Sequence, residues 1–443
     1  LELFDNASPG GRRHTLYAVL NHTRSPMGAR LLRRWLTAPL LEQEGIEARH
    51  EAVAELAEGE RLRGGLQGAI AQVRDLERIV GRVVLPVAQV ADVVALREAL
   101  GALQFLPPLL AELTAPALRE LAADFDPLAD VHVYLQRHLL PEPSLKMSEG
   151  GYIAEGVMPE LDHLRSLSRD SRAVLSRLES SERERTGITS LKVRYNRVFG
   201  YYLEISKANQ AKVPPDYIRK QTLVNAERYV TPELQELEEQ ILGAEERIQT
   251  LELAQFHEIR AVLGGYARRL QKSAAQVAEL DVLAGLAEAA RENRYVRPRL
   301  LSPDAPRRLS LLAGRHPVIE RIDFDEPFIP NDLELAAETQ QILLITGPNM
   351  AGKSTVMRQV ALIQLMAQAG SFVPADSAEL PLVDRIFTRV GASDNLSRGQ
   401  STFMMEMNEA ANILNNATPR SLVVLDEIGR GTSTFDGISI AWA

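Results

Sequence analysis

The sequence contains no cysteine. This excludes disulfides and thiolate metal sites, and it suits a reducing cytoplasm, where we expect the protein to work. The 8 histidines are scattered along the chain. His132 and His138 are six residues apart, which is wrong for one helical face, and we interpret them as structural or solvated residues. No run of residues is typical of a transmembrane helix or a secretory signal, so we predict no membrane partner.

Positive charge is not in excess either, since the formal net charge is −9. A nucleic-acid role would therefore need a local basic patch. The 443 residues are too many for one core, and about two to four domains are expected. The chain begins at Leu1 without methionine and ends at Ala443 within an apolar segment. We therefore expect a fragment of a longer protein.

Residues 341–355, QILLITGPNMAGKST, carry the clearest chemistry. Apolar residues 342–345 predict a buried strand, and Gly352-Lys353-Ser354-Thr355 opens a helix. Together they form the G-x-x-x-x-G-K-[ST] pattern in a strand–loop–helix context. The alternative is a chance glycine-rich turn. The predicted nucleotide-binding residues are Gly347, Pro348, Asn349, Met350, Ala351, Gly352, Lys353, Ser354 and Thr355.

The residue types fit a nucleoside triphosphate. Glycines let backbone N–H groups approach phosphate oxygens closely, and a helix N-terminus adds partial positive charge. Lys353 would contact the β- and γ-phosphates, while the Ser354 hydroxyl would bind Mg²⁺. We therefore predict ATP and Mg²⁺ as cofactors.

A second apolar strand, residues 422–425, ends in Asp426 and Glu427. Asp426 lies 73 residues after Lys353. We predict that Asp426 holds Mg²⁺ and that Glu427 orients or deprotonates the attacking water. A Ser/Gly loop at 395–403 offers donors to a phosphate, but the pattern leaves open which phosphate. Phe328 either stacks on adenine or packs in the core.

Residues 1–155 have the pattern of a helical core domain, in which Ser25 is the N-cap of a helix and Pro26 its first residue. Residues 156–186 and 231–295 have longer helical periodicity, with a second N-cap at Thr231. The heptad spacing after Thr231 favours a two-helix seam, a lever about 45 Å long. The alternative is a three-helix bundle with a β insertion.

Residues 187–230, between the lever helices, alternate apolar and basic residues like half-exposed strands. Eight basic side chains against three acidic ones give this insertion a charge of +5, and Lys220 and Arg228 are among the basic ones. Six aromatic residues lie here as well. One interpretation is a β-rich clamp that contacts the backbone of duplex DNA. The other is a solvated sheet whose aromatics form a small core.

These motifs together resemble the MutS family of DNA mismatch-repair ATPases over essentially the whole chain. The ATPase domain of that family is resembled by TGPNMAGKST, RVGASDNLSRGQSTFMMEM and LDEIGRGTSTFDG. Its clamp is resembled by YNRVFGYYLEIS and TLVNAERYVTPEL, and its core by TRSPMGARLLRRWL and DLERIVGRV. The fold class implied is a multidomain α and α/β protein, with a helical core, a lever pair carrying a β clamp, and a P-loop ATPase domain of the ABC type at 296–443.

The resemblance also implies roles for particular residues. The family is a dimer with composite ATP sites, in which Ser401 matches a serine that reaches the partner's γ-phosphate. Arg430 matches an arginine of the loop after the acids, and Phe328 matches the aromatic that stacks on adenine. Asn225 and Arg228 match positions at which the clamp touches the DNA backbone. A downstream factor of the MutL type is the implied protein partner.

The departures from the family pattern limit what this chain should do alone. The amino-terminal mismatch-reading domain and the connector domain are absent, as are a later ATPase histidine and a terminal helix–turn–helix. We therefore expect a DNA-coupled ATPase fragment that does not recognise mismatches by itself and has an incomplete ATP site. Two alternatives stay open: a paralogue acting on recombination intermediates, and a structural ATP-dependent assembly module without DNA contact.

Overall fold

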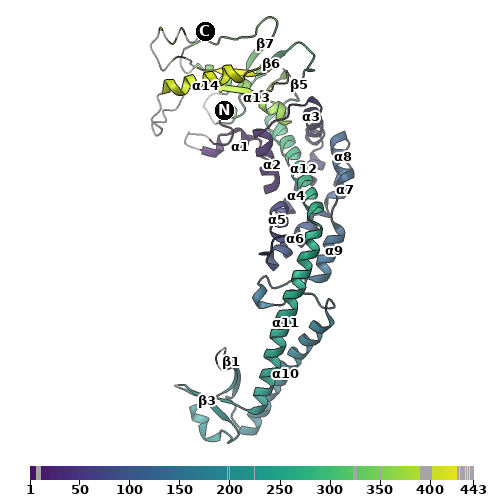
Figure 1. The fold of residues 1–443 in the computed structure, drawn as a ribbon, viewed down its shortest axis with the longest axis vertical. Helices are drawn as coiled ribbons and strands as arrows, with labels where there is room; N and C mark the ends of the chain where they lie inside the picture. Colours follow the sequence, from purple (N-terminus) through teal and green to yellow (C-terminus); the bar gives the residue numbers. More distant parts are fainter. Residues whose placement is uncertain are drawn as a thin grey trace. The chain divides into compact units, whose positions relative to one another are not determined.

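The computed structural model describes residues 1–5, 11–196, 198, 200–223, 225–322, 327–348, 351–389, 402–426, 429, 435, 437 and 439. It is a protein of mixed helix and sheet content (Figure 1). The chain divides into two compact units. The first unit comprises Leu1–Glu77, Ala99–Pro127 and Arg269–Ala443, and the second comprises Arg78–Glu98 and Leu128–Arg268.

Helices dominate the first unit. They are α1 (Leu16–Leu20), α2 (Pro26–Thr37), α3 (Gln43–Glu58), α4 (Glu60–Gln72), α7 (Leu106–Leu110), α8 (Pro116–Asp124), α12 (Ala267–Asn293), α13 (Lys353–Ala369) and α14 (Thr402–Asn416). The predicted cap of α2 is confirmed, because the Ser25 hydroxyl accepts a hydrogen bond from the Gly28 N–H at 3.0 Å. Ser25 also donates to buried Asp281 of α12 at 2.6 Å, which fastens the start of α2 to that helix.

Two sheets accompany these helices in the first unit. The larger contains β5 (Arg299–Leu300), β6 (Arg308–Gly314), β7 (Asn331–Ala336) and β8 (Ser377–Leu380), in the order β5-β8-β6-β7. The smaller pairs β9 (Ile386–Arg389) with β10 (Leu422–Leu425) in parallel. The strand predicted at 422–425 is therefore confirmed, and its last residue lies opposite Arg389.

The second unit contains two long helices. Its elements include α9 (Ala129–His138), α10 (Pro159–Thr186) and α11 (Pro232–Gly265). Two further helices cross the boundary: α5 (Leu76–Val83) begins in the first unit, and α6 (Val90–Leu103) ends in it. Helices α10 and α11 pack side by side (Figure 1). The 34 residues of α11 make a rod about 51 Å long at 1.5 Å per residue. Thr231 caps α11 and Pro232 is its first residue, as predicted.

The seam between α10 and α11 differs in part from the predicted heptad. Leu234, Ile241 and Ala244 are buried as expected, but the next fully buried position of α11 is Glu252. The carboxylate of Glu252 forms an ion pair with Arg165 of α10 and accepts a hydrogen bond from the Gly151 N–H at 2.7 Å. A buried charge costs free energy unless it is paired, and these two contacts supply the pairing.

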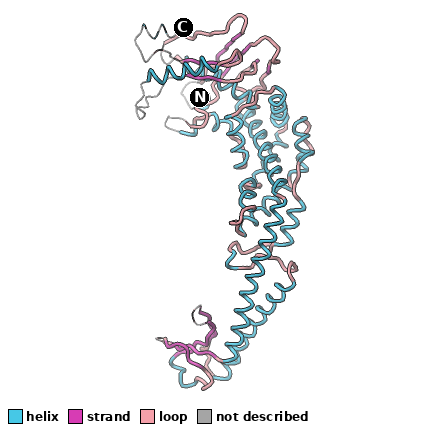
Figure 2. Tube along the Cα trace, in the orientation of Figure 1, coloured by secondary structure: helices cyan, strands magenta, loops and turns pink. Residues whose placement is uncertain are grey.

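The insertion folds as an antiparallel sheet at the end of α10 and the start of α11 (Figure 2). Its strands are β1 (Lys192–Asn196), β2 (Gly200–Ser206), β3 (Ile218–Thr222) and β4 (Ala226–Val230), in the order β1-β2-β4-β3. One face packs on the two helices through a cluster that includes Leu203, Ile205 and Tyr229. The two strands predicted around 191–195 and 201–205 are confirmed. The assignment of core, lever, clamp and ATPase region to separate domains stays a prediction.

One helical stretch, Val90–Leu110, is long and apolar enough to cross a membrane by length and composition alone. Half of it is buried inside the protein. A buried core helix meets the same criterion, so this stretch needs no membrane to explain its composition.

Candidate functional site

The candidate phosphate-binding loop leads into α13, and its last residue before the helix requires glycine. Gly352 is the N-cap of α13 at φ +87°, a left-handed conformation that residues with a Cβ rarely adopt. Lys353 is the first helical residue, and Ser354 and Thr355 follow in the first turn, half-buried. The unpaired N–H groups of this turn and the helix dipole make the end of α13 a favourable position for an anion.

Lys353 lies within reach of the loop that precedes it. Its ammonium group donates to the Gly347 carbonyl at 2.6 Å and to the Pro348 carbonyl at 3.3 Å. The ammonium group thus joins the start of α13 to the backbone of Gly347 and Pro348. Ala351 belongs to the same loop, since its N–H donates to the Pro348 carbonyl at 3.4 Å. Asn349 and Met350, which were also predicted to bind nucleotide, lie outside the described residues.

The prediction of a buried strand at residues 342–345 is wrong. The segment is not part of a strand, and Ile342 and Leu344 are 85% and 84% exposed. An extended segment becomes a strand only when a neighbour supplies hydrogen-bond partners, and no strand among the described residues pairs with this one. Apolar character alone does not provide that neighbour.

Asp426 lies directly after β10 and is buried. Its N–H donates to the Arg389 carbonyl at 2.7 Å, which extends the pairing of β10 with β9 by one step. Helix α13 packs against β10. Asp426 and Ser354 therefore come from two elements in contact, and a carboxylate with a hydroxyl is an oxygen donor set suited to Mg²⁺. The predicted catalytic residues Glu427 and Ser401, as well as Arg430, lie outside the described residues.

Glu406 was missed by the sequence analysis. It lies on α14, is buried, and its carboxylate accepts a hydrogen bond from the Gly429 N–H in the loop after the acids. Glu406 thereby fixes the described part of that loop to α14. The signal in the sequence was a single acid within the run FMMEM, since a charge surrounded by apolar residues needs a buried partner.

Phe328 is half-buried in the segment that leads into β7. Its exposure is compatible with both interpretations of the sequence, adenine stacking and core packing. Nearby on β6, Gly314 lies opposite Asn331, the first residue of β7, after a shift in register. A Cβ at Gly314 would lie 2.6 Å from the side-chain nitrogen of Gln359 on α13. This close contact ties the position of α13 to the sheet that Phe328 precedes.

The insertion carries the candidate nucleic-acid interface. Lys220 on β3 is exposed, and so is Asn225 in the turn before β4. Arg228 differs from both, because it is half-buried with its guanidinium 4.3 Å from the centroid of the Tyr202 ring. Arg228 also donates to the side chain of Gln221 at 2.6 Å. The structure therefore gives Arg228 partners inside the sheet, whereas Lys220 and Asn225 present their side chains to solvent.

The insertion carries further exposed cations besides Lys220. Lys192, Lys207 and Lys212 are exposed, and within the described part of the insertion none of them forms an ion pair. The acidic side chains are largely occupied, since Glu204 pairs with Arg194 at 3.3 Å and Asp216 pairs with Arg185 at 3.0 Å. The lysines thus carry uncompensated positive charge, as a polyanion-binding surface requires.

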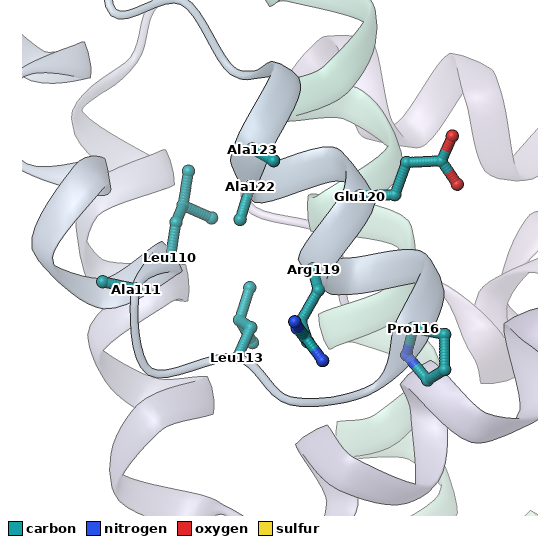
Figure 3. A pocket seen from close by; sticks show the side chains of 8 residues that line it. All are labelled: Leu110, Ala111, Leu113, Pro116, Arg119, Glu120, Ala122 and Ala123. Carbon is teal, nitrogen blue, oxygen red and sulfur yellow. The ribbon is translucent and has the colours of Figure 1, made fainter.

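A surface hollow of about 570 Å³ lies between the end of α7 and α8 (Figure 3). None of the residues predicted to bind nucleotide or DNA lines it. Its walls include Leu110, Leu113 and Arg119, and in Figure 3 the Glu120 side chain points away from them. The walls bring together no acid–base pair or nucleophile, so the hollow has no catalytic constellation of its own.

Comparisons with known proteins agree over the whole chain. Residues 1–287 match MutS domain III, and residues 343–443 match MutS domain V. The DNA mismatch repair protein MutS of Symbiobacterium thermophilum is 53% identical over 443 residues, which is 100% of this chain and 50% of that protein. Proteins of the same name from Syntrophobacter fumaroxidans and Chlorobaculum tepidum are 52% and 51% identical, again over 100% of this chain and 50% of theirs. The chain spans about half the length of the curated relatives it matches.

Proposed function

The chain belongs to the MutS family, and from this membership we propose that it acts in DNA mismatch repair as a DNA-coupled ATPase. In this proposal the first unit binds and hydrolyses ATP at the start of α13, and the insertion grips duplex DNA. The observation that carries the proposal is the joint occurrence of two features. One is the Gly352–Lys353–Ser354 helix start beside the strand that ends in Asp426, and the other is the lysine-rich sheet on α10 and α11.

The residues at the start of α13 suit a triphosphate. The ammonium group of Lys353 is attached to a flexible stem and now contacts two loop carbonyls, so it can exchange these for phosphate oxygens. The N–H groups of the first turn donate to the same oxygens. Ser354 and Asp426 would hold Mg²⁺, which when bound neutralises charge that develops on the phosphates. Glu427 follows Asp426 in sequence and would orient the attacking water.

Phe328 would stack on adenine, and Thr355 would complete the first turn that faces the phosphates. Ser401 and Arg430 would act across a homodimer, each completing the ATP site of the partner. A factor of the MutL type would then respond to the ATP-bound dimer in the cytoplasm, with the protein held at the nucleoid when bound to DNA. These proposals rest on the family resemblance of the residues concerned.

On the insertion, we propose that Lys220 and Asn225 contact the DNA backbone, with Lys192, Lys207 and Lys212 adding long-range attraction. Arg228 would order the sheet beneath them through Tyr202 and Gln221. Contacts of this kind neutralise phosphates without reading bases, so binding should depend strongly on salt and weakly on sequence.

The test is ATP turnover by the natural polypeptide that carries these 443 residues, measured with and without duplex DNA. Lys353→Ala should lower turnover on the order of 100-fold, because a preorganised charge at the transferred phosphate is lost. Lys146→Ala is the matched control, since Lys146 is an exposed lysine that pairs with Glu149 nearby in the chain. Equal turnover by Lys353→Ala and the unaltered protein would refute the assignment of the ATP site.

A further inference from the structure

At the C-terminal end of α13, the end away from Lys353, the backbone carbonyls have hydrogen-bond partners outside the regular helix pattern. The last four carbonyls of a helix have no partner within it and must find one elsewhere. Here all four have one, as follows. Met366 accepts from the Ser371 N–H at 2.9 Å, Ala367 accepts from His50 Nε2 at 3.0 Å, Gln368 accepts from the Leu40 N–H at 3.1 Å, and Ala369 accepts from the Arg49 guanidinium at 3.0 Å.

Three of these four donors come from residues 40–50, far from α13 in the sequence. The contact is reciprocal, because the Gln368 side chain donates to the Leu40 carbonyl at 2.9 Å. The same side chain exchanges hydrogen bonds with the backbone of Val383 at 3.0 and 3.1 Å. A polar network of this kind, buried at one helix end, fixes the position of that end against α3.

Arg49 supplies the charge of this network. Its guanidinium lies 3.4 Å from the centroid of the Trp35 ring on α2. Burial lowers the pKa of Arg49 to about 10, and Glu279 of α12 acts in the opposite direction, so the side chain stays protonated at neutral pH. A cation at a helix C-terminus is favoured by the helix dipole. Arg49 thus connects α13 with α2 and α3, and the charge of Glu279 on α12 acts on it.

At the C-terminal end of α13, the backbone of Gly370 lies very close to Arg49. Gly370 ends α13 at φ +95°, and a Cβ there would lie 2.6 Å from the Cβ of Arg49. Only glycine allows the two backbones to approach this closely. The 17 residues of α13 then form a rod about 25 Å long at 1.5 Å per residue. One end of this rod carries Lys353 and the other carries the Arg49 network.

We propose that Arg49, together with His50 and Leu40, is a positioning anchor for the phosphate-binding end of α13. Held at its far end, the helix moves with α2, α3 and α12 as one body, so a displacement of those helices changes where Lys353 and Ser354 stand. In this proposal the anchor is one connection by which the helices of the first unit influence ATP turnover, including its response to DNA. This inference rests on the proposed function and adds a mode of regulation to the same site.

The experiment compares Arg49→Gln with Arg63→Gln in the natural polypeptide that carries this chain. Arg63 is a matched control, because its buried guanidinium also donates to the end of a helix, the Leu56 and Ala57 carbonyls of α3, at 2.7 and 3.2 Å. Both variants should lower the unfolding midpoint. Only Arg49→Gln should reduce the ratio of turnover with DNA to turnover without DNA, by about fivefold. Arg49→Lys retains the charge and should restore most of the ratio.

A second readout does not depend on activity. Hydrogen exchange at residues 353–358 should quicken in Arg49→Gln and stay unchanged in Arg63→Gln, because only the first releases the far end of α13. If exchange and the turnover ratio respond equally to both variants, or to neither, the anchor is overturned. If the unaltered protein shows no ATP turnover, the proposed function fails, and the exchange measurement alone then decides on the anchor.

Discussion

The insertion sheet and the nucleotide-binding region satisfy their backbones in opposite ways. In the insertion, each strand pairs with a neighbour close in sequence, and Leu203 is completely buried against α10 and α11. In the nucleotide-binding region, β9 and β10 pair only with each other among the described strands. In the apolar segment 342–345, Ile342 and Leu344 are largely exposed. The two regions have similar apolar residues but differ in strand pairing and in burial.

The difference follows from how far apart the partners are in sequence. An antiparallel hairpin such as β1–β2 closes through a short turn, whereas parallel strands need a long connection and additional strands on either side. The sheet of the insertion also packs on the apolar surface of two helices, α10 and α11. The nucleotide-binding region instead secures α13 at its far end, through the network around Arg49.

Two leucines test this comparison most strongly. Leu203→Ala should cost about 4 kcal/mol, because the side chain is fully buried and its removal leaves a cavity. Leu344→Ala should cost less than about 0.5 kcal/mol, because that side chain is 84% exposed. Hydrogen exchange of peptides covering each segment measures the local free energy of opening. Equal costs for the two substitutions would show that residues 342–345 are packed after all.

Two glycines of the insertion test how closely its sheet packs against α11. Gly187→Ala should cost about 1 kcal/mol, since φ is +63° but the space around it is open. Gly200→Ala should cost more, about 1.5 kcal/mol, since φ is +71° and the flexible carboxylate of Glu238 on α11 must also move aside. The same exchange measurement on β2 decides. Should the two variants be equally stable, the contact between the hairpin and α11 is looser than the structure indicates.

Local signals in the sequence predicted much of this fold. The caps at Ser25 and Thr231 were predictable because a hydroxyl followed by proline satisfies the first N–H groups of a helix from within a few residues. The strands β1, β2 and β10 were predictable from periodicity and turn residues. These features depend on neighbours in the sequence.

Features that depend on distant partners were not predictable. Glu252 in the lever seam, Asp281 beneath α2 and Glu406 on α14 are buried carboxylates, and each is satisfied by groups from elsewhere in its own unit. A heptad pattern assigns Glu252 to the surface, because nothing in the sequence shows where Arg165 will lie. The error at 342–345 has the same origin, since a strand depends on its neighbours as well as on its own residues.

The anchored end of α13 predicts a dependence on pH. Burial lowers the pKa of His50 to about 4, from an ordinary value of 6.5. Between these two pH values the unfolded chain binds a proton at His50 and the folded chain does not. The contribution of neutral His50 to the free energy of unfolding is therefore complete above pH 6.5 and falls progressively as the pH drops towards 4. At pH 5 the loss is about 2 kcal/mol relative to pH 7.

His50→Gln isolates this effect, because glutamine can donate to the same Ala367 carbonyl without titrating. Between pH 7 and pH 5, urea unfolding followed by tryptophan fluorescence should show the unaltered protein losing about 2 kcal/mol more than the variant. His163→Gln, at an exposed position on α10, should track the unaltered protein. Parallel pH profiles for His50→Gln and the unaltered protein would contradict a neutral, buried His50.

The smallest expected effect on stability concerns the exposed surface of the insertion, where Lys220 contributes charge and little packing. Lys220→Gln should leave the stability of the sheet within about 0.5 kcal/mol, since its side chain is exposed. It should weaken DNA binding equally for all sequences and reduce the slope of log affinity against log salt by about 1, because one phosphate contact is lost. Arg228→Gln should instead loosen the sheet, because it removes the contact with Tyr202. An unchanged salt slope would place the phosphate contacts on other lysines of this surface. A change in stability with Lys220→Gln would contradict its exposed position.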